Sequence, residues 1–255
     1  MTATPRALVT GASEGIGRVF ALRLARDGYA VTAVARNEAR LQSLMAELGP
    51  GHDYRVADLA DPAHIAALGE HLARVRCNLL VNNAAFGIYG DFARVPLPEL
   101  QRLLRLNVDA LVALSHAFLR QAQAGDALVN VSSILAFLPM PLNGIYAATK
   151  AFVTSFSESL WQQQRPRGVY VLGLCPGGTA TLFHERAGAG TRSAGGAVQT
   201  PEQVVEAAMR ALRSRRSPTV VSGWHNRLFV FATRLLPRKW VVSAMGRQSP
   251  PTRHD

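Results

Sequence analysis

The chain has 255 residues, of which 48% are hydrophobic, and this is enough material for one large α/β domain with a buried core. It contains only two cysteines, so a disulfide-stapled secreted scaffold is excluded. No apolar run approaches the roughly 20 residues that span a bilayer, and the first predicted strand starts too early to leave room for a signal peptide. The formal net charge is +11, and we therefore expect a basic globular protein of the cytoplasm.

Predicted strands and helices alternate along the chain. The strands are expected at 6–10, 29–35, 53–56, 78–82, 127–132, 169–174 and 218–221, and the helices at 15–27, 38–48, 62–75, 97–123, 145–165 and 201–213. Such alternation produces a parallel sheet, so the predicted fold class is α/β, a single doubly wound, Rossmann-like sheet with helices on both faces. We expect one domain over 1–222, with a basic amphipathic C-terminal extension over 223–255.

A glycine-rich turn follows the first predicted strand and opens the first predicted helix. Its sequence, Gly11-Ala12-Ser13-Glu14-Gly15-Ile16-Gly17, has the spacing G-x-x-x-G-x-G. Glycines let the backbone approach a pyrophosphate, and the helix N-terminus supplies amide donors and the positive end of a dipole. A tight turn without a ligand would need the same glycines, but the position after the first strand favours a dinucleotide site.

The end of the second predicted strand indicates which cofactor binds. An Asp or Glu there usually bonds the ribose 2′-hydroxyl of NAD, but this chain has Ala35 at that position, followed by Arg36. An arginine fork suits the 2′-phosphate of NADP, and Ser13 and Arg40 are further candidate donors. The alternative is a solvated arginine at a helix start. We expect NADP(H) as the cofactor.

Tyr146 and Lys150 lie four residues apart in a predicted helix, with Ser133 upstream, and the chain has only two lysines. Residues i and i+4 share one face of a helix, so the lysine ammonium is expected to lower the pKa of the phenol. Such a tyrosine exchanges a proton with a substrate oxygen, and Ser133 is placed to hydrogen-bond the same oxygen.

These motifs together resemble the short-chain dehydrogenase/reductase family. The resemblance covers nearly all of residues 6–222 and includes the turn 10–17, the run 82–85, in which Ala85 replaces the family's glycine, and the segment 176–181. It implies four catalytic residues, namely Asn107, Ser133, Tyr146 and Lys150. The implied cofactor-binding residues are Gly11, Ser13, Glu14, Gly15, Ile16, Gly17, Arg36, Asp58, Leu59, Asn83, Ala84, Tyr146, Lys150, Pro176, Gly177 and Thr179. No metal site is predicted.

The predicted activity is hydride transfer between NADPH and a carbonyl or secondary alcohol. Tyr146 would supply the proton, Ser133 would polarise the oxygen, and Lys150 would lower the tyrosine pKa and hold the nicotinamide ribose. The resemblance further implies that Asn107 positions a water behind Lys150. Two alternatives remain, a sensor or scaffold that binds NADP without turnover and a sugar-nucleotide epimerase. The intact catalytic set argues against the first, and the lack of a separate substrate domain argues against the second.

The substrate side is predicted to be apolar. Aromatic and aliphatic residues follow the fourth strand and precede Tyr146; those expected at the entrance are Phe86, Ile88, Tyr89, Phe92, the run 135–141, Phe183 and His184. An apolar ketone, steroid-like or ketoacyl substrate is therefore favoured. Residues 186–200 are small and polar and are interpreted as a lid that orders on binding.

The charge excess is concentrated in the tail. No Asp or Glu occurs between Ala207 and His254, and residues 224–236 have helical apolar spacing, with Leu228, Phe229, Ala232, Leu235 and Leu236 on one expected face. Two interpretations compete: a helix over the substrate cleft or at a subunit interface, and a peripheral membrane contact. Nucleic acid is not expected as a partner, because no groove-reading motif accompanies the charge. The family resemblance implies a homodimer or homotetramer through helices 97–123 and 145–165.

Overall fold

The computed structural model describes residues 4–181, 187 and 198–248. Within them one seven-stranded parallel sheet runs in the order β3-β2-β1-β4-β5-β6-β7. The strands are β1 (Arg6–Thr10), β2 (Ala30–Ala35), β3 (Asp53–Val56), β4 (Leu79–Asn82), β5 (Ala127–Val131), β6 (Tyr170–Cys175) and β7 (Thr219–Val221). The predicted doubly wound α/β class is confirmed.

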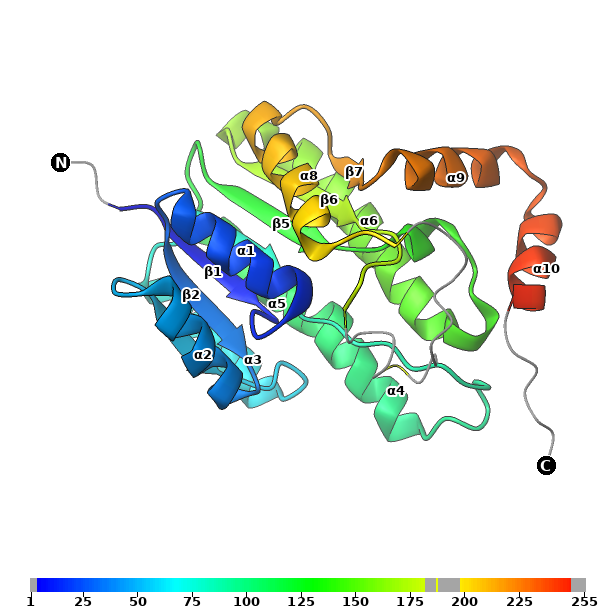
Figure 1. The fold of residues 1–255 in the computed structure, drawn as a ribbon, viewed down its shortest axis with the longest axis horizontal. Helices are drawn as coiled ribbons and strands as arrows, with labels where there is room; N and C mark the ends of the chain where they lie inside the picture. Colours follow the sequence, from blue (N-terminus) through cyan, green and yellow to red (C-terminus); the bar gives the residue numbers. More distant parts are fainter. Residues whose placement is uncertain (1–3, 182–186, 188–197, 249–255) are drawn as a thin grey trace.

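Helices cover both faces of the sheet (Figure 1). The helices that follow the strands are α1 (Gly15–Arg26), α2 (Glu38–Leu48), α3 (Pro62–Arg74), α5 (Leu111–Gln121), α6 (Gly144–Gln164) and α8 (Pro201–Ser214). Helices α1, α2 and α8 pack on one face, and α3, α5 and α6 pack on the other. Because side chains alternate along a strand, Val129 joins the first layer and its neighbour Leu128 joins the second. The central strands are therefore buried on both sides.

One predicted helix, 97–123, is divided in the structure. Helix α4 (Leu97–Leu104) passes into a π-helical turn, η1 (Arg105–Ala110), which continues into α5. A π turn inserts one residue into the helical repeat and rotates the side chains that follow it. The sequence spacing did not indicate this turn, and it contains Asn107.

Short helical turns connect the remaining elements. They are η2 (Ile134–Phe137) and η3 (Pro141–Asn143) before α6, and η4 (Arg165–Arg167) after it. Two helices follow the sheet, α9 (Trp224–Leu235) and α10 (Arg238–Gln248), and Pro237 separates them as predicted. Val241 and Met245 of α10 are buried against Leu138, Met140 and Ala147, so the tail packs on the segment before α6 and on the start of that helix.

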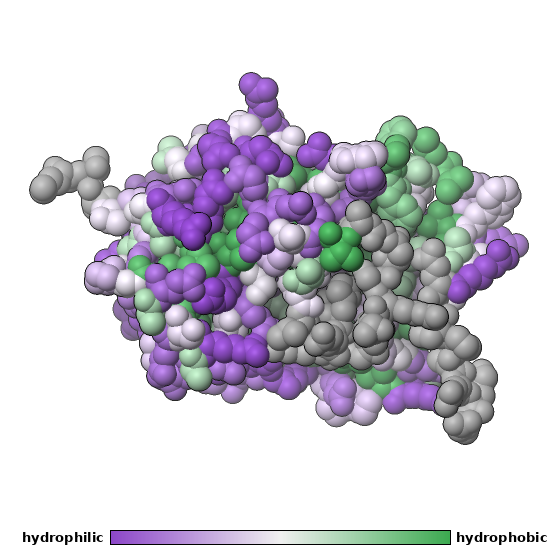
Figure 2. Space-filling view, in the orientation of Figure 1, coloured by the Kyte–Doolittle hydropathy of each residue, from purple (hydrophilic) through white to green (hydrophobic). Residues whose placement is uncertain are grey.

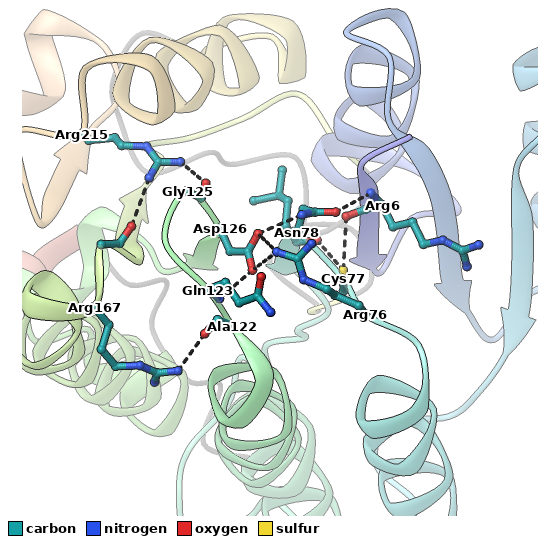
Figure 3. A network of polar contacts seen from close by, with 12 residues as sticks. Arg6, Arg76, Cys77, Asn78, Ala122, Gln123, Gly125, Asp126, Arg167 and Arg215 are labelled. Carbon is teal, nitrogen blue, oxygen red and sulfur yellow. Dashed lines mark hydrogen bonds and ion pairs between the residues drawn. The ribbon is translucent and has the colours of Figure 1, made fainter. Parts of the chain in front are cut away.

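A polar network closes the edge of the sheet where the strands begin (Figure 3). The buried carboxylate of Asp126 accepts bonds from Arg76 Nη2 at 3.1 and 3.2 Å, from Asn78 Nδ2 at 2.9 Å and from the Gln123 N–H at 2.8 Å. Asn78 Oδ1 in turn accepts from the Arg6 N–H at 3.0 Å, which joins β1 to the segment before β4. Asp126 thus gathers donors from two segments, 76–78 and 123, at the opposite edge from the strands' carboxyl ends.

Replacement of Asp126 by Ala is expected to lower the free energy of unfolding by about 2–3 kcal/mol, because the partly buried donors lose their charged acceptor. Urea denaturation measures the change. Arg76→Ala, which removes a half-exposed partner of the same carboxylate, should cost about 1 kcal/mol or less. Equal losses in the two variants would contradict the assignment of Asp126 as the centre of the network.

Candidate active site

The carboxyl ends of the strands open onto a cavity of about 500 Å³. Most of the predicted site residues line it: Gly11, Ser13, Glu14, Gly15, Ile16, Arg36, Asp58, Leu59, Asn83, Ala84, Ser133, Tyr146, Lys150, Pro176, Gly177 and Thr179. Gly17 and Asn107 do not line it and instead lie behind its wall. Parallel strands place their carboxyl ends at one edge, so residues distant in sequence meet in this cavity.

The glycine-rich turn is built for close backbone approach. A Cβ atom on Gly11 would lie 2.7 Å from Asn83 Nδ2, and Gly11 itself has a φ of +66°, which favours glycine. Asn83 Nδ2 donates to the carbonyls of Thr10 and Gly11 at 3.0 and 3.2 Å and so fixes the turn to the end of β4. No side chain caps the N-terminus of α1, and Gly15 and Ile16 of its first turn line the cavity. This arrangement fits the pyrophosphate of a dinucleotide.

Arg36 lines the cavity and is exposed at the end of β2, next to the buried Ala35. Asp58 lies nearby, after β3, and pairs with Arg102 at 2.7 Å. Partial burial works to raise the pKa of Asp58, but hydrogen bonds from the Ala60 N–H and from Arg102 hold it below its ordinary value. Arg40, the other candidate cation, pairs with Glu14 and does not line the cavity. Arg36 is therefore the better placed of the two arginines for a bound anion.

Tyr146 is buried at the start of α6, and its hydroxyl hydrogen-bonds Ser133. Burial raises the pKa of Tyr146 above its ordinary value, and the bond to Ser133 offsets only part of this rise. The sequence predicted a lowered pKa, and the structure differs because the ring is enclosed while the ammonium of Lys150 is bonded elsewhere. A protonated phenol is the form that donates a proton.

Lys150 lies one turn after Tyr146, and its Nζ is 5.5 Å from the tyrosine ring centroid. The ammonium donates to the Val131 carbonyl at 2.8 Å, at the end of β5. Burial lowers the pKa of Lys150 to about 8, so the side chain is still mainly protonated at neutral pH. The backbone carbonyl of Lys150 accepts from Ser132 Oγ at 2.8 Å, which ties α6 to the segment after β5 that contains Ser133.

The other half of the cavity is apolar, and the tail contributes to it. Its apolar side chains come from the segment after β4, from η2 with the residue after it, and from the tail; they are Phe86, Tyr89, Leu135, Leu138, Phe229 and Met245. The prediction that Phe92 lies at the entrance is wrong, because this side chain is 65% exposed and does not line the cavity. Phe183, His184 and most of the predicted lid lie outside the described residues.

Comparison with known proteins agrees with this geometry. The family model of the short chain dehydrogenases matches residues 5–191. The chain belongs to the short-chain dehydrogenase/reductase family. It is therefore an oxidoreductase that acts on CH–OH groups with NAD(P) as the acceptor.

Individual relatives of this short-chain dehydrogenase have varied substrates. It is 31% identical to sulfoacetaldehyde reductase 2 of Chromohalobacter salexigens over 94% of this chain and 98% of that one. It is 35% identical to a very-long-chain 3-oxoacyl-CoA reductase of Laccaria bicolor, over 65% of this chain and only 52% of that relative. A short-chain dehydrogenase from Sphingobium yanoikuyae in complex with NADPH superposes with a TM-score of 0.80 at 31% identity, covering 98% of both chains.

Asn107 of this dehydrogenase does not line the cavity but bonds residues behind the cavity wall. Its Oδ1 accepts from the Phe86 N–H at 3.1 Å, and its Nδ2 donates to the Phe86 carbonyl at 2.9 Å and to Thr149 Oγ1 at 3.2 Å. The amide thus clamps the segment after β4 to α6. The water-positioning role implied by the family resemblance stays a prediction.

Sequence reasoning missed His225, Asn226 and Met245 as lining residues of the dehydrogenase cavity. Asn226 Nδ2 donates to the Ser222 carbonyl at 2.8 Å and to Gln199 Oε1 at 3.2 Å. A Cβ atom on Gly177 would lie 2.3 Å from Asn226 Nδ2, so the start of α9 packs directly on the Pro176–Gly177 segment. The only signal in the sequence was the apolar spacing of the tail, which does not say which face turns inward.

Proposed function

We propose that this protein is an NADPH-dependent reductase whose substrate is an apolar carbonyl compound: a ketone, a steroid-like molecule or a ketoacyl compound. The observation that carries the proposal is one cavity in which Ser133, Tyr146 and Lys150 stand between a glycine-rich turn and an apolar wall. A binding protein without turnover would need no hydroxyl pair beside a buried lysine. We assign residues 1–222 as the catalytic domain, and we propose that the extension over 223–255 completes the substrate side of the cavity.

The chemistry assigned to the chain's own residues is proton transfer and charge stabilisation. The nicotinamide cofactor, when bound, supplies the hydride. The Tyr146 hydroxyl donates its proton to the substrate oxygen, and the Ser133 hydroxyl donates a hydrogen bond to the same oxygen as negative charge develops on it. The Lys150 ammonium, fixed by the Val131 carbonyl, favours the tyrosinate that remains. Residues Gly11–Gly17 and Arg36 would hold the pyrophosphate and the 2′-phosphate.

An apolar substrate is supported over a small anion such as sulfoacetaldehyde. The lining residues that the structure describes include one arginine, Arg36, and one lysine, Lys150. Arg36 lies on the cofactor side of the cavity, and Lys150 lies beside Tyr146. Sulfonate recognition is strengthened by a positive charge on the substrate side. Phe86, Leu138 and Phe229 provide hydrocarbon there instead.

Subunit association through α4, α5 and α6 is part of the proposal. Large apolar side chains are exposed on α4 and α6, including Leu97, Leu104 and Phe152, and Phe152 stacks on Phe156 with ring centroids 5.6 Å apart. Exposed apolar patches of this kind mark interaction surfaces. Sedimentation velocity of Phe152→Ser against the wild type tests this surface.

The purified protein is expected to bind NADPH at least about tenfold more tightly than NADH, because a charge-assisted bond from Arg36 is worth about 1.5–3 kcal/mol. Fluorescence titration of both cofactors measures the preference, and a turnover screen of bulky and small ketones with NADPH tests the substrate class. Arg36→Ala should remove most of the preference, while Arg26→Ala, on the exposed side of α1, should leave it unchanged. Equal affinities in the wild type would contradict the assignment of Arg36.

A further inference from the structure

Helix α9 has two apolar faces, and one of them has no partner among the described residues. Its inner face packs on the domain through Val230 and Thr233, and Phe229 lines the cavity. On the opposite side an outer stripe is formed by Trp224, Leu228, Phe231 and Leu235, each between 59% and 71% exposed. Their spacing of four, three and four residues places them in one line along the helix. The sequence predicted Leu228 and Phe229 on one face, but Leu228 lies on the outer side and Phe229 on the cavity side.

The outer stripe is visible as apolar surface over α9, beside the hydrophilic surface near α10 (Figures 1 and 2). Trp240 of α10 is also 67% exposed, although Val241 and Met245 of the same helix are buried. The stripe is about 18 Å long for the twelve residues of α9, so it can lie along an apolar boundary. None of the described helices is both long enough and apolar enough to cross a bilayer.

Positive charge borders the outer stripe, and α9 and α10 contain no Asp or Glu. Arg227 and Arg234 lie beside the stripe on α9, and Arg238, Lys239 and Arg247 are exposed on α10. Arg234 lies 5.0 Å from the Phe137 ring centroid and Arg238 donates to the Phe137 carbonyl at 3.2 Å, so two of these cations are held in place by the domain. The sequence has no Asp or Glu between Ala207 and His254.

Charge decides between the two occupants that such a face can have. A second copy would bring the same arginines and lysine against one another across a two-fold axis, with no carboxylate on α9 or α10 to pair with them. A surface of anionic lipids offers phosphates to the cations and hydrocarbon to the stripe. A tryptophan at each helix also suits the boundary between headgroups and acyl chains.

We propose that the outer face of α9 and α10 docks on an anionic lipid surface. Leu228, Phe231 and Leu235 would insert beside Trp224, and the flanking cations would contact lipid phosphates. Because the inner face of α9 lines the cavity, docking would hold the substrate side of the cavity next to the lipid. The binding itself does not rest on the proposed reaction, so it can be tested without turnover.

Cosedimentation of the full chain with vesicles tests the proposal. Vesicles of phosphatidylcholine with phosphatidylglycerol are expected to bind at least about tenfold more tightly than phosphatidylcholine alone, since each basic residue near an anionic surface contributes about fivefold. Salt should remove most of this difference, because the screening length falls from about 10 Å at 0.1 M to about 3 Å at 1 M. Lys239→Gln, which removes an exposed cation, should weaken binding to the anionic vesicles by about fivefold.

The matched variants separate the stripe from exposed apolar surface in general. The triple variant L228S/F231S/L235S should lose about tenfold or more of the affinity for anionic vesicles, because it removes most of the inserted hydrocarbon. The control V56S/F92S changes side chains that are 48% and 65% exposed outside the tail, and it should bind like the wild type. Circular dichroism checks that both variants are folded.

Three results would overturn the proposal. One is a wild-type chain that stays in the supernatant with both kinds of vesicle. Another is a folded triple variant that sediments with the anionic vesicles as well as the wild type does. The third is a triple variant that, without vesicles, is a smaller species than the wild type in sedimentation velocity, because a second copy would then cover the outer stripe.

Discussion

Replacement of Tyr146 by Phe is expected to lower kcat for ketone reduction by about 10²–10⁴-fold while NADPH affinity stays nearly unchanged. Phenylalanine keeps the ring that fills the buried site beside Lys150 and deletes only the hydroxyl. The burial that raises the pKa of Tyr146 keeps this hydroxyl protonated at neutral pH, so the loss removes the proton donor itself. Steady-state kinetics on a ketone found by screening, together with a cofactor titration, measures both quantities.

Tyr89→Phe is the matched control, because Tyr89 also lines the cavity and undergoes the same chemical change. It should leave kcat largely unaffected. A Tyr146→Phe variant with wild-type kcat would mean that another group supplies the proton. A loss of NADPH affinity equal to the loss of kcat would mean that the hydroxyl serves the cofactor site rather than proton transfer.

The sheet and the cofactor side of the site follow from local signals in the sequence. The strand before Gly11 and the helix after Gly17 are both marked by apolar periodicity, and the turn between them has glycines at the points of close approach. Once the strands are ordered in one parallel sheet, residues just past their ends must share an edge. This is why Arg36, Ser133 and Pro176 could be assigned to one cavity from sequence, and the structure places them in its lining.

The substrate side needed information that periodicity does not contain. Apolar side chains in α9 occupy both faces of the helix, so the spacing of Leu228 and Phe229 could not say which one turns toward the cavity. The same limit applies to η1, where the π turn rotates Asn107 onto the Phe86 backbone. The pKa of Tyr146 also depended on tertiary structure, because burial outweighs the effect expected from a lysine four residues away.

Replacement of Gly17 by Ala is expected to weaken NADPH binding by about tenfold or more and to lower the free energy of unfolding by about 1–3 kcal/mol. The new Cβ atom would lie 2.2 Å from the Gly11 carbonyl oxygen and 2.5 Å from Asn83 Nδ2. The first of these is a backbone atom of the turn itself, so the clash cannot be relieved by moving a side chain. The turn must shift, and Asn83, which bonds the Thr10 and Gly11 carbonyls, must shift with it.

Gly69→Ala is the matched control, and its effect should have the opposite sign. Gly69 lies inside α3, and an added Cβ atom there would meet nothing within 4 Å. Alanine is a better helix former than glycine, so this variant should be more stable by about 0.5–1 kcal/mol and should bind NADPH like the wild type. Urea denaturation and cofactor titration of both variants measure the contrast. A Gly17→Ala protein that binds NADPH normally would contradict this prediction. It would show that the start of α1 is not packed closely on Gly11, and the pyrophosphate site would then have to be assigned to another segment of the cavity.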